Sequence, residues 1–260
     1  MTRALIFDCD GVLADTERDG HRVAFNQAFA EFDLPITWDD ETYARLVKIG
    51  GGKERIASVL TPELLRHAGL NVDEAQRQQL IRDLHQRKTA LFQHRIHSGA
   101  IPSRTGVARL INEALNANIR VAVASTSAPQ SVRSVLIHAV GEQLANEIPV
   151  FAGDIVARKK PAPDIYLHAL AELGIGSAEA IAVEDSHVGA TAAHQAGMQV
   201  LVTVASYTRN EDFTGAALVV DHLGHTNQPA TALHDPHGLM TGHSIIDMEV
   251  IEAIYALSRQ

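Results

Sequence analysis

Short apolar runs alternate with helical patterns at the start of the chain and again from residue 101 onward. The run Ala4-Leu5-Ile6 predicts a buried strand, because it is short and wholly apolar. Similar runs predict strands at residues 119–124, 150–151, 180–183, 200–204 and 217–220. Apolar spacings of three and four residues predict helices between them, at residues 103–115, 132–139, 163–173 and 186–196. Strands that alternate with helices indicate a parallel sheet with helices on both faces.

Residues 16–97 break this alternation, because they carry helical patterns and no strand pattern. Thr61-Pro62-Glu63 is typical of a helix start, and Gly69 of a helix end. Residues 73–96 predict one long helix. We therefore predict an α/β protein in which residues 1–15 and 99–260 form a Rossmann-like parallel-sheet core, and residues 16–98 form an inserted all-α domain.

The last part of the chain has a different composition. Residues 222–243 are rich in His, Gly, Thr and Pro and predict a loop, whereas Ser244 begins a capping pattern for a helix that reaches about residue 258. Five histidines of this part include two H-x-x-H pairs. We expect no metal site there, because no cysteine or close set of acids completes one.

Net charge, cysteine content and hydropathy limit the kinds of partner and compartment that we expect for this protein. The formal net charge of −9 disfavours nucleic acid as the main partner, because no broad basic surface can neutralise phosphates. The single cysteine, Cys9, excludes an internal disulfide and indicates a reducing compartment. No apolar run approaches the roughly 18 residues that a membrane helix needs, and no signal-peptide pattern precedes Asp8. We expect a cytoplasmic, monomeric protein without a membrane or nucleic-acid partner.

The most informative segment follows the first predicted strand and reads Asp8-Cys9-Asp10-Gly11. Acids at the carboxyl end of a parallel strand face the crevice where α/β sheets bind ligands. Residues two apart leave a regular strand on the same face, so Asp8 and Asp10 would repel unless a cation or a shared proton relieved them. A divalent metal with a phosphorylated ligand would do so, while Cys9 would face the core.

Three further polar signals follow predicted elements in order: Ser125 after a strand, Lys160 in a Lys-Lys-Pro sequence, and Glu184-Asp185 at the end of another strand. Each alone has an ordinary explanation as a cap, a turn or a solvated charge. Together, the motifs DxDGVLxDTE, KKPxPDIY and VEDSxxG resemble those of the haloacid dehalogenase superfamily of phosphotransferases over nearly the whole chain.

This resemblance implies specific roles. Asp8 would be the nucleophile that forms an aspartyl-phosphate, and Asp10 would protonate the leaving alcohol and then deprotonate water. Ser125 and Lys160 would bind the phosphoryl group. Asp8, the carbonyl of Asp10, Asp185 and, directly or through water, Glu184 would bind Mg²⁺. The inserted helical domain would be the cap of this superfamily.

A glycine-rich segment in the insertion reads Gly50-Gly51-Gly52-Lys53-Glu54-Arg55. It is no P-loop, because Glu54 replaces the hydroxyl residue and no strand precedes it. It is either a flexible helix break or a substrate loop, in which Gly51 and Gly52 allow close approach and the two cations bind a second phosphate.

With Thr16-Glu17 before this segment and Thr126-Ser127 after the second motif, it resembles the CbbY-like phosphatases. These remove a phosphate from xylulose 1,5-bisphosphate, a by-product that inhibits Rubisco of the Calvin cycle. The resemblance implies that Glu17 and Tyr43 contact sugar hydroxyls and that Lys53 and Arg55 contact the distal phosphate. It adds Thr126 and Ser127 to the substrate site. His21 lies one residue out of the family's register.

Three alternatives remain open at this point. A sugar-phosphate mutase of the β-phosphoglucomutase type uses the same two aspartates, and motifs do not separate it from a phosphatase. Phosphoglycolate phosphatase acts on a smaller ligand with one phosphate, which the charges of Lys53 and Arg55 disfavour. A non-catalytic binding protein would lack a motif residue, and none is missing.

Overall fold

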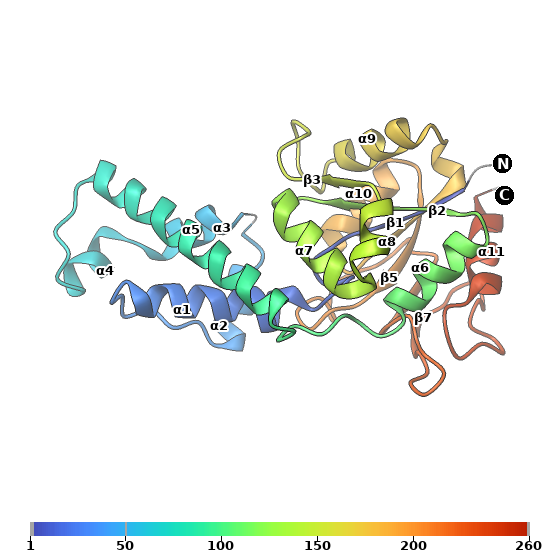
Figure 1. The fold of residues 1–260 in the computed structure, drawn as a ribbon, viewed down its shortest axis with the longest axis horizontal. Coiled ribbons are helices and arrows are strands. Elements are labelled where there is room, and N and C mark those ends of the chain that lie inside the picture. Colours follow the sequence, from blue (N-terminus) through green and yellow to red (C-terminus); the bar gives the residue numbers. More distant parts are fainter. Residues whose placement is uncertain (1–2, 50, 259–260) are drawn as a thin grey trace. The chain divides into compact units, whose positions relative to one another are not determined.

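The computed structural model describes residues 3–49 and 51–258 and divides the chain into two compact units. Unit 1 comprises Met1–Asp15 and Pro102–Gln260, and unit 2 comprises Thr16–Ile101 (Figure 1). The chain thus leaves unit 1 after Asp15 and returns at Pro102, whereas the sequence pattern suggested a return at residue 99. Gly50, the first glycine of the glycine-rich segment, lies outside the described residues.

A seven-stranded sheet forms the centre of unit 1 (Figure 1). Its strands are β1 (Ala4–Phe7), β2 (Arg120–Ser125), β3 (Val150–Ala152), β4 (Ala180–Glu184), β5 (Gln199–Thr203), β6 (Leu218–Val220) and β7 (Ala232–His234). The spatial order is β3-β2-β1-β4-β5-β6-β7, and every neighbouring pair is parallel except β6 and β7. The predicted α/β fold with a parallel sheet is confirmed.

Helices cover both faces of this sheet. They are α6 (Val107–Asn116), α7 (Pro129–Val140), α8 (Glu142–Glu147), α9 (Asp164–Leu173), α10 (His187–Gln195) and α11 (Met248–Leu257). Helices α9 and α10 pack on one face, where the sheet carries small side chains such as Ala122 and Ala182. All four residues of β1 are fully buried, which explains why its sequence is an unbroken apolar run.

Two predicted helix starts are wrong. Helix α6 begins at Val107 after Gly106 and not at Ser103, because the backbone at Gly106 has a φ of 88°. A Cβ atom at Gly106 would lie 2.4 Å from the carbonyl oxygen of Gly224, so tertiary packing determines this start. Helix α11 is capped by Asp247, whose side chain accepts from the Val250 amide, and not by Ser244.

The predicted loop of residues 222–243 also contains a strand. Strand β7 pairs antiparallel with β6 at the edge of the sheet. Its residues are all exposed, so the strand has no buried face and leaves no alternating pattern in the sequence. Backbone pairing alone therefore defines it.

The described part of unit 2 consists of helices joined by loops, without a strand. A π-helical turn, η1 (Glu17–Arg22), leads into α1 (Val23–Glu31), followed by α2 (Asp40–Leu46), α3 (Gly52–Val59), α4 (Pro62–His67) and α5 (Glu74–His97). Thr61 caps α4 as predicted, and Asp73 forms a capping box with Gln76 at the start of α5. Phe25, Phe29 and Trp38 pack against one another in its core with ring-centroid distances of 4.8 to 6.2 Å.

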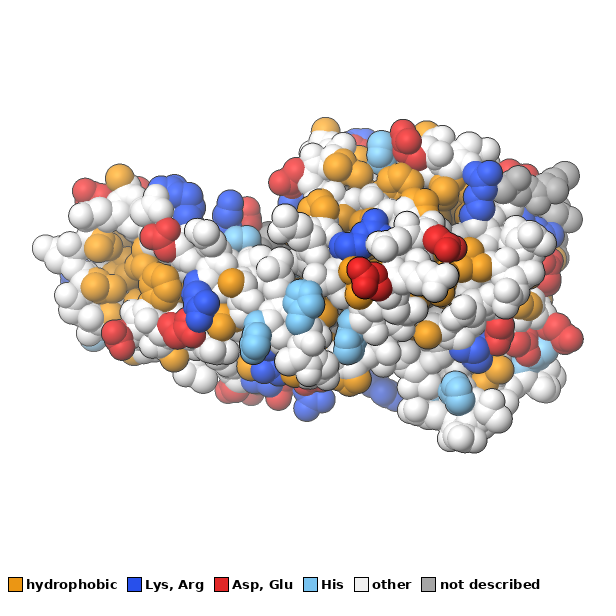
Figure 2. Space-filling view, in the orientation of Figure 1, with side chains coloured by type: hydrophobic (Ala, Val, Ile, Leu, Met, Phe, Trp, Pro, Cys, Tyr) orange, Lys and Arg blue, Asp and Glu red, His pale blue; other side chains and the backbone are white. Residues whose placement is uncertain are grey.

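On the face drawn in Figure 2, basic side chains are interspersed with acidic ones over the described residues. Among those residues, no helix combines the length and the apolar character required to cross a bilayer.

Candidate active site

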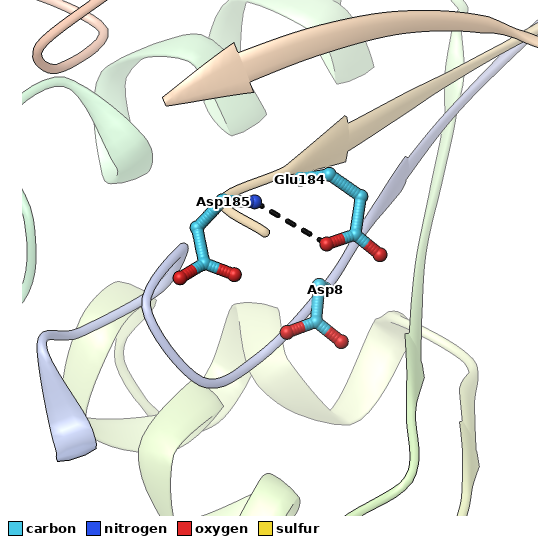
Figure 3. A group of neighbouring side chains, drawn as sticks. All are labelled: Asp8, Glu184 and Asp185. Atoms are coloured by element: carbon cyan, nitrogen blue, oxygen red, sulfur yellow. Dashed lines mark hydrogen bonds between the residues drawn. The ribbon is translucent and has the colours of Figure 1, made fainter. Parts of the chain in front are cut away.

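Three buried carboxylates meet at the carboxyl ends of β1 and β4 (Figure 3). Asp8 directly follows β1, Glu184 ends β4 and Asp185 follows it. The two strands are parallel neighbours, and the Asp8 amide donates to the Val183 carbonyl at 2.9 Å. One ligand oxygen from each of these acids lies within 4.8 Å of the others. The group is the only one of its kind among residues 3–49 and 51–258.

Lys160 joins two of these acids. Its Nζ lies 2.7 Å from Asp8 Oδ1 and 2.7 Å from Glu184 Oε1, and its side chain is 7% exposed. It also donates to the Ala124 carbonyl at 3.1 Å. The lysine therefore fixes the orientation of the Asp8 carboxylate against the end of β2 and leaves its second oxygen outside this ion pair.

Tyr166 is a site residue that the sequence analysis missed. Its hydroxyl donates to Glu184 Oε1, and Lys160 Nζ lies 3.2 Å from the same hydroxyl. Tyr166 is fully buried on α9. It belongs to the Pro-Asp-Ile-Tyr part of the lysine motif, which was the available signal, but an aromatic residue on an apolar helix face reads as core.

Burial dominates the electrostatics of this cluster. The pKa of Asp8 is raised to about 7, mainly by burial; Lys160 acts to lower it, and the charges of Glu184 and Asp10 add to the rise. Burial likewise raises the pKa of Asp185 well above its usual range, with Glu184 and Asp8 adding to the effect. For Lys160 burial acts to lower the pKa, but the charges of Asp8 and Glu184 outweigh it and raise the pKa. One ammonium thus faces three carboxylates, and a divalent cation would balance the remaining negative charge.

Two glycines enclose the carboxylates of β4. A Cβ atom at Gly189 would lie 2.1 Å from Glu184 Oε2, and one at Gly11 would lie 2.1 Å from Asp185 Oδ2. Gly11 also has a φ of 81°. Since backbone closes on both acids, their oxygens occupy fixed positions. Oxygen ligands held in this way fit Mg²⁺, which prefers carboxylates and water.

Asp10 lies in the turn after β1, and not in the strand. Strand β1 ends at Phe7, so strand alternation does not explain where Asp10 points, and that part of the prediction was wrong. Asp10 accepts a hydrogen bond from the hydroxyl of Ser127. Ser125 is 1% exposed and its Oγ accepts from the Ser127 amide at 3.1 Å, whereas Thr126 is exposed. Cys9 is buried, as predicted.

A second polar network lies inside unit 2. Tyr43 donates to Glu17 Oε2 at 2.5 Å and accepts from Arg55 Nη1 at 2.6 Å, and Arg55 Nη1 lies 3.2 Å from the same Glu17 oxygen. The Arg55 guanidinium also donates to the carbonyls of Ile49 and Val47 at 3.2 and 3.4 Å. Arg55 is therefore a buried cation held between an acid, a phenol and backbone.

Lys53 differs from Arg55, because it is exposed in the first turn of α3. Gly51 precedes this helix with a φ of 95°. At Gly52, a Cβ atom would lie 2.9 Å from the His85 ring, so no larger residue fits without a shift. The glycines thus bring the start of α3 close to α5.

His21 and Lys88 form a further buried pair, of which the sequence pattern drew attention only to His21. Lys88 Nζ lies 2.8 Å from His21 Nδ1, and the His21 ring stacks on Phe92 with centroids 3.9 Å apart. Nearby, burial and the charges of Lys88 and Lys53 lower the pKa of His85 to about 4. His85 is thus neutral near pH 7, and the positive charge of this region comes from the lysines.

Comparison with known proteins identifies the family. A model described as haloacid dehalogenase-like hydrolase matches residues 2–197. The chain belongs to the haloacid dehalogenase-like hydrolases. It is 45% identical over 228 residues to a CBBY-like protein of Arabidopsis thaliana, covering 86% of this chain and 70% of the relative. It is 40% identical over 231 residues to the plasmid-encoded CbbY of Cupriavidus necator, covering 87% and 88%.

A solved structure agrees with this assignment. The structure of a mutant CbbY from Rhodobacter sphaeroides in complex with xylulose-(1,5)bisphosphate is 41% identical and has a TM-score of 0.73. The match covers 87% of this chain and 98% of that chain. The predicted resemblance is confirmed, and the chain is a phosphatase of the haloacid dehalogenase-like hydrolases related to CbbY.

Proposed function

We propose that this haloacid dehalogenase-like hydrolase is a magnesium-dependent phosphatase that hydrolyses xylulose 1,5-bisphosphate through an aspartyl-phosphate. The contact between Lys160 and Asp8 carries the proposal. A buried lysine ammonium at 2.7 Å from one carboxylate oxygen acts to lower the Asp8 pKa against the effect of burial, and so favours the ionised carboxylate. An ionised, oriented carboxylate is what attack on phosphorus requires.

The reaction proceeds in two displacements. In the first, an oxygen of Asp8 forms a bond to phosphorus while the bond from phosphorus to the sugar oxygen breaks, and Asp10 gives its proton to that leaving oxygen. In the second, Asp10 takes a proton from water, and the water oxygen displaces Asp8 from phosphorus. Both aspartates return to their starting states, and the products are inorganic phosphate and the sugar monophosphate.

The remaining residues of the site stabilise the transferred group. Lys160 and the hydroxyl of Ser125 would bind phosphoryl oxygens, because charge on these oxygens governs the barrier of phosphoryl transfer. Asp8, Glu184, Asp185 and the Asp10 carbonyl would hold Mg²⁺. When bound, this ion neutralises the charge that Asp8 and the phosphoryl group would otherwise bring together. The donor set fits it, because all available ligands are oxygens with carboxylates within 4.8 Å.

We assign the choice of substrate to unit 2. Glu17 and Tyr43 would bind sugar hydroxyls, Lys53 and Arg55 the phosphate that is not transferred, and Gly51 and Gly52 would let the backbone approach it. The xylulose-(1,5)bisphosphate bound to the related CbbY supports this choice. The exposed ammonium of Lys53 and the fixed guanidinium of Arg55 supply two cations for a ligand with a second phosphate. Thr126 and Ser127 of unit 1 complete the proposed substrate residues.

A phosphate-release assay tests this function. The purified chain, with and without Mg²⁺, is given xylulose 1,5-bisphosphate, phosphoglycolate and β-glucose 1-phosphate. We expect xylulose 1,5-bisphosphate to have the highest kcat/KM, with one phosphate released per sugar and no turnover after chelation. Asp8→Asn should be inactive.

Two results would contradict the proposal. Conversion of β-glucose 1-phosphate without free phosphate would identify a mutase. Efficient hydrolysis of phosphoglycolate, together with unchanged xylulose 1,5-bisphosphate turnover in Lys53→Ala and Arg55→Ala, would show that the second phosphate is not recognised.

A further inference from the structure

Arg104 joins the loop after β1 to the ends of two other strands. Its guanidinium donates to the carbonyl oxygens of Gly11, Thr203, Val204 and Asp221. The contacts to Thr203 and Val204, at the end of β5, are both 2.7 Å. Asp221 directly follows β6. Each terminal nitrogen thus makes two hydrogen bonds to backbone, a geometry that only the planar fork of arginine provides.

The sheet order gives these contacts a specific consequence. Strand β4, which carries Glu184 and leads to Asp185, lies between β1 and β5. Arg104 therefore connects backbone on both sides of β4, just beyond the point where the acidic ligands project. Its own amide donates to the Leu13 carbonyl at 2.9 Å, which fixes it to the same loop a second time.

Gly11 transmits this restraint to Asp185. The Gly11 carbonyl is held by Arg104, while the Cα side of Gly11 is so close to Asp185 that a Cβ atom would lie 2.1 Å from Oδ2. In Figure 3 the loop after β1 passes beside the Asp185 carboxylate. Thr208 contacts the same oxygen at 3.4 Å through its hydroxyl. The peptide that Arg104 holds therefore lies directly against the Asp185 carboxylate.

Electrostatic interactions also connect Arg104 with Asp185. Burial lowers the pKa of Arg104, and the neighbouring carboxylates of Asp185, Asp15 and Asp221 oppose this effect. Arg104 thus carries its charge close to the acidic cluster without an ion pair to Asp185 that would compete with a metal ion. Residues that orient metal ligands in this indirect way commonly alter metal affinity by about 10- to 100-fold.

We propose that Arg104 is a positioning residue that sets the affinity of the Asp8–Glu184–Asp185 site for a divalent cation, by holding the Gly11 peptide against Asp185. This inference rests on the proposed function, in which that site binds Mg²⁺. Arg104 contacts neither substrate nor metal in this scheme. Nothing in the sequence motifs marks it, because it follows the return to unit 1 in a segment that reads as a helix start.

Arg109 supplies a matched control. It also belongs to unit 1 and also donates to backbone carbonyls, at Leu223 and Ile246 with distances of 2.9 Å. Leu223 follows β6 and Ile246 lies between β7 and α11, so neither carbonyl belongs to the loop beside Asp185. Replacing Arg109 therefore removes a comparable set of hydrogen bonds without touching the acidic site.

The test measures cation binding directly. Chelator-treated parent, Arg104→Lys, Arg104→Met, Arg109→Lys and Arg109→Met are titrated with Mn²⁺, and bound ion is followed by electron paramagnetic resonance. Urea unfolding of each metal-free variant reports folding. We expect both Arg104 variants to bind Mn²⁺ about tenfold more weakly or worse, and both Arg109 variants to bind it as the parent does. Lysine keeps the positive charge but lacks the planar guanidinium, so Arg104→Lys should bind Mn²⁺ as weakly as Arg104→Met. It also provides the test if Arg104→Met does not fold.

Kinetics separate positioning from general destabilisation. With Mg²⁺ as the varied component, the Arg104 variants should need about tenfold more Mg²⁺ for half-maximal rate, while kcat at saturating Mg²⁺ stays near that of the parent. Equal Mn²⁺ affinity in the parent and the Arg104 variants would overturn the proposed role of Arg104 and leave the proposed function standing. Equal weakening in the Arg109 variants would do the same. If the parent itself binds no Mn²⁺, the magnesium part of the proposed function fails first.

Discussion

Replacing Lys160 with Met removes the one cation between Asp8 and Glu184. Both contacts are 2.7 Å and the lysine side chain is 7% exposed, so the variant leaves buried carboxylates without their partner. Breaking a buried pair in this way costs about 3–5 kcal/mol. The same loss removes the group that opposes the effect of burial at Asp8, so the Asp8 pKa should rise further from about 7 and the proposed nucleophile should become protonated. We expect kcat to fall by about 10²- to 10³-fold or more.

Lys159→Met is the matched control for this prediction. Lys159 pairs with Asp154 at 2.9 Å, but both side chains are exposed, and such pairs contribute about 0–1 kcal/mol. Urea unfolding of the metal-free proteins gives the stability difference, and phosphate release at saturating substrate and Mg²⁺ gives kcat. Parental kcat in Lys160→Met, or an equal loss in Lys159→Met, would refute the reasoning from the buried ion pair.

Three further predictions concern pH, ligand geometry and unit 2. The Asp8 pKa is raised from 3.8 to about 7 on folding, so between these pH values the folded state binds more protons than the unfolded state. The metal-free protein should therefore lose stability relative to Asp8→Asn as pH rises from 3.8 to about 7. A difference in unfolding free energy that does not change with pH would contradict this. Gly189→Ala should displace the Glu184 carboxylate and weaken Mn²⁺ binding by about tenfold, and unchanged binding would show that Glu184 is no ligand. Arg55→Met should lower the free energy of unfolding by about 3–5 kcal/mol, because it removes the buried cation that pairs with Glu17. Lys53 is exposed, so Lys53→Met should change the free energy of unfolding by no more than ~0.5 kcal/mol. Equal effects of the two substitutions in urea unfolding would contradict this difference.

Local sequence determined the central elements of unit 1. Strands with two buried faces are apolar along most of their length, so β1, β2 and β4 stand out as short apolar runs. The acids follow them at once, and parallel strands bring their carboxyl ends to one edge of the sheet. The pattern thus places Asp8, Glu184 and Asp185 at strand ends, the resemblance to the haloacid dehalogenase superfamily implies one shared metal site, and the structure brings the three acids together. The caps at Thr61 and Asp73 were equally local, since side chain and amide lie within three residues.

Tertiary structure alone decided the features that depend on distant backbone. Tyr166 contributes to the site because α9 places its hydroxyl against Glu184. Gly11 and Gly189 are required because the carboxylates of Asp185 and Glu184 lie where a Cβ atom would be. Arg104 contributes because it donates to four backbone carbonyls that are distant from one another in the sequence. Strand β7 has no alternating apolar pattern in the sequence, because its exposed residues pair with β6 through the backbone. Sequence thus determines chemistry that is carried by side-chain type at strand ends, whereas contacts to backbone far along the chain exist only once the sheet has formed.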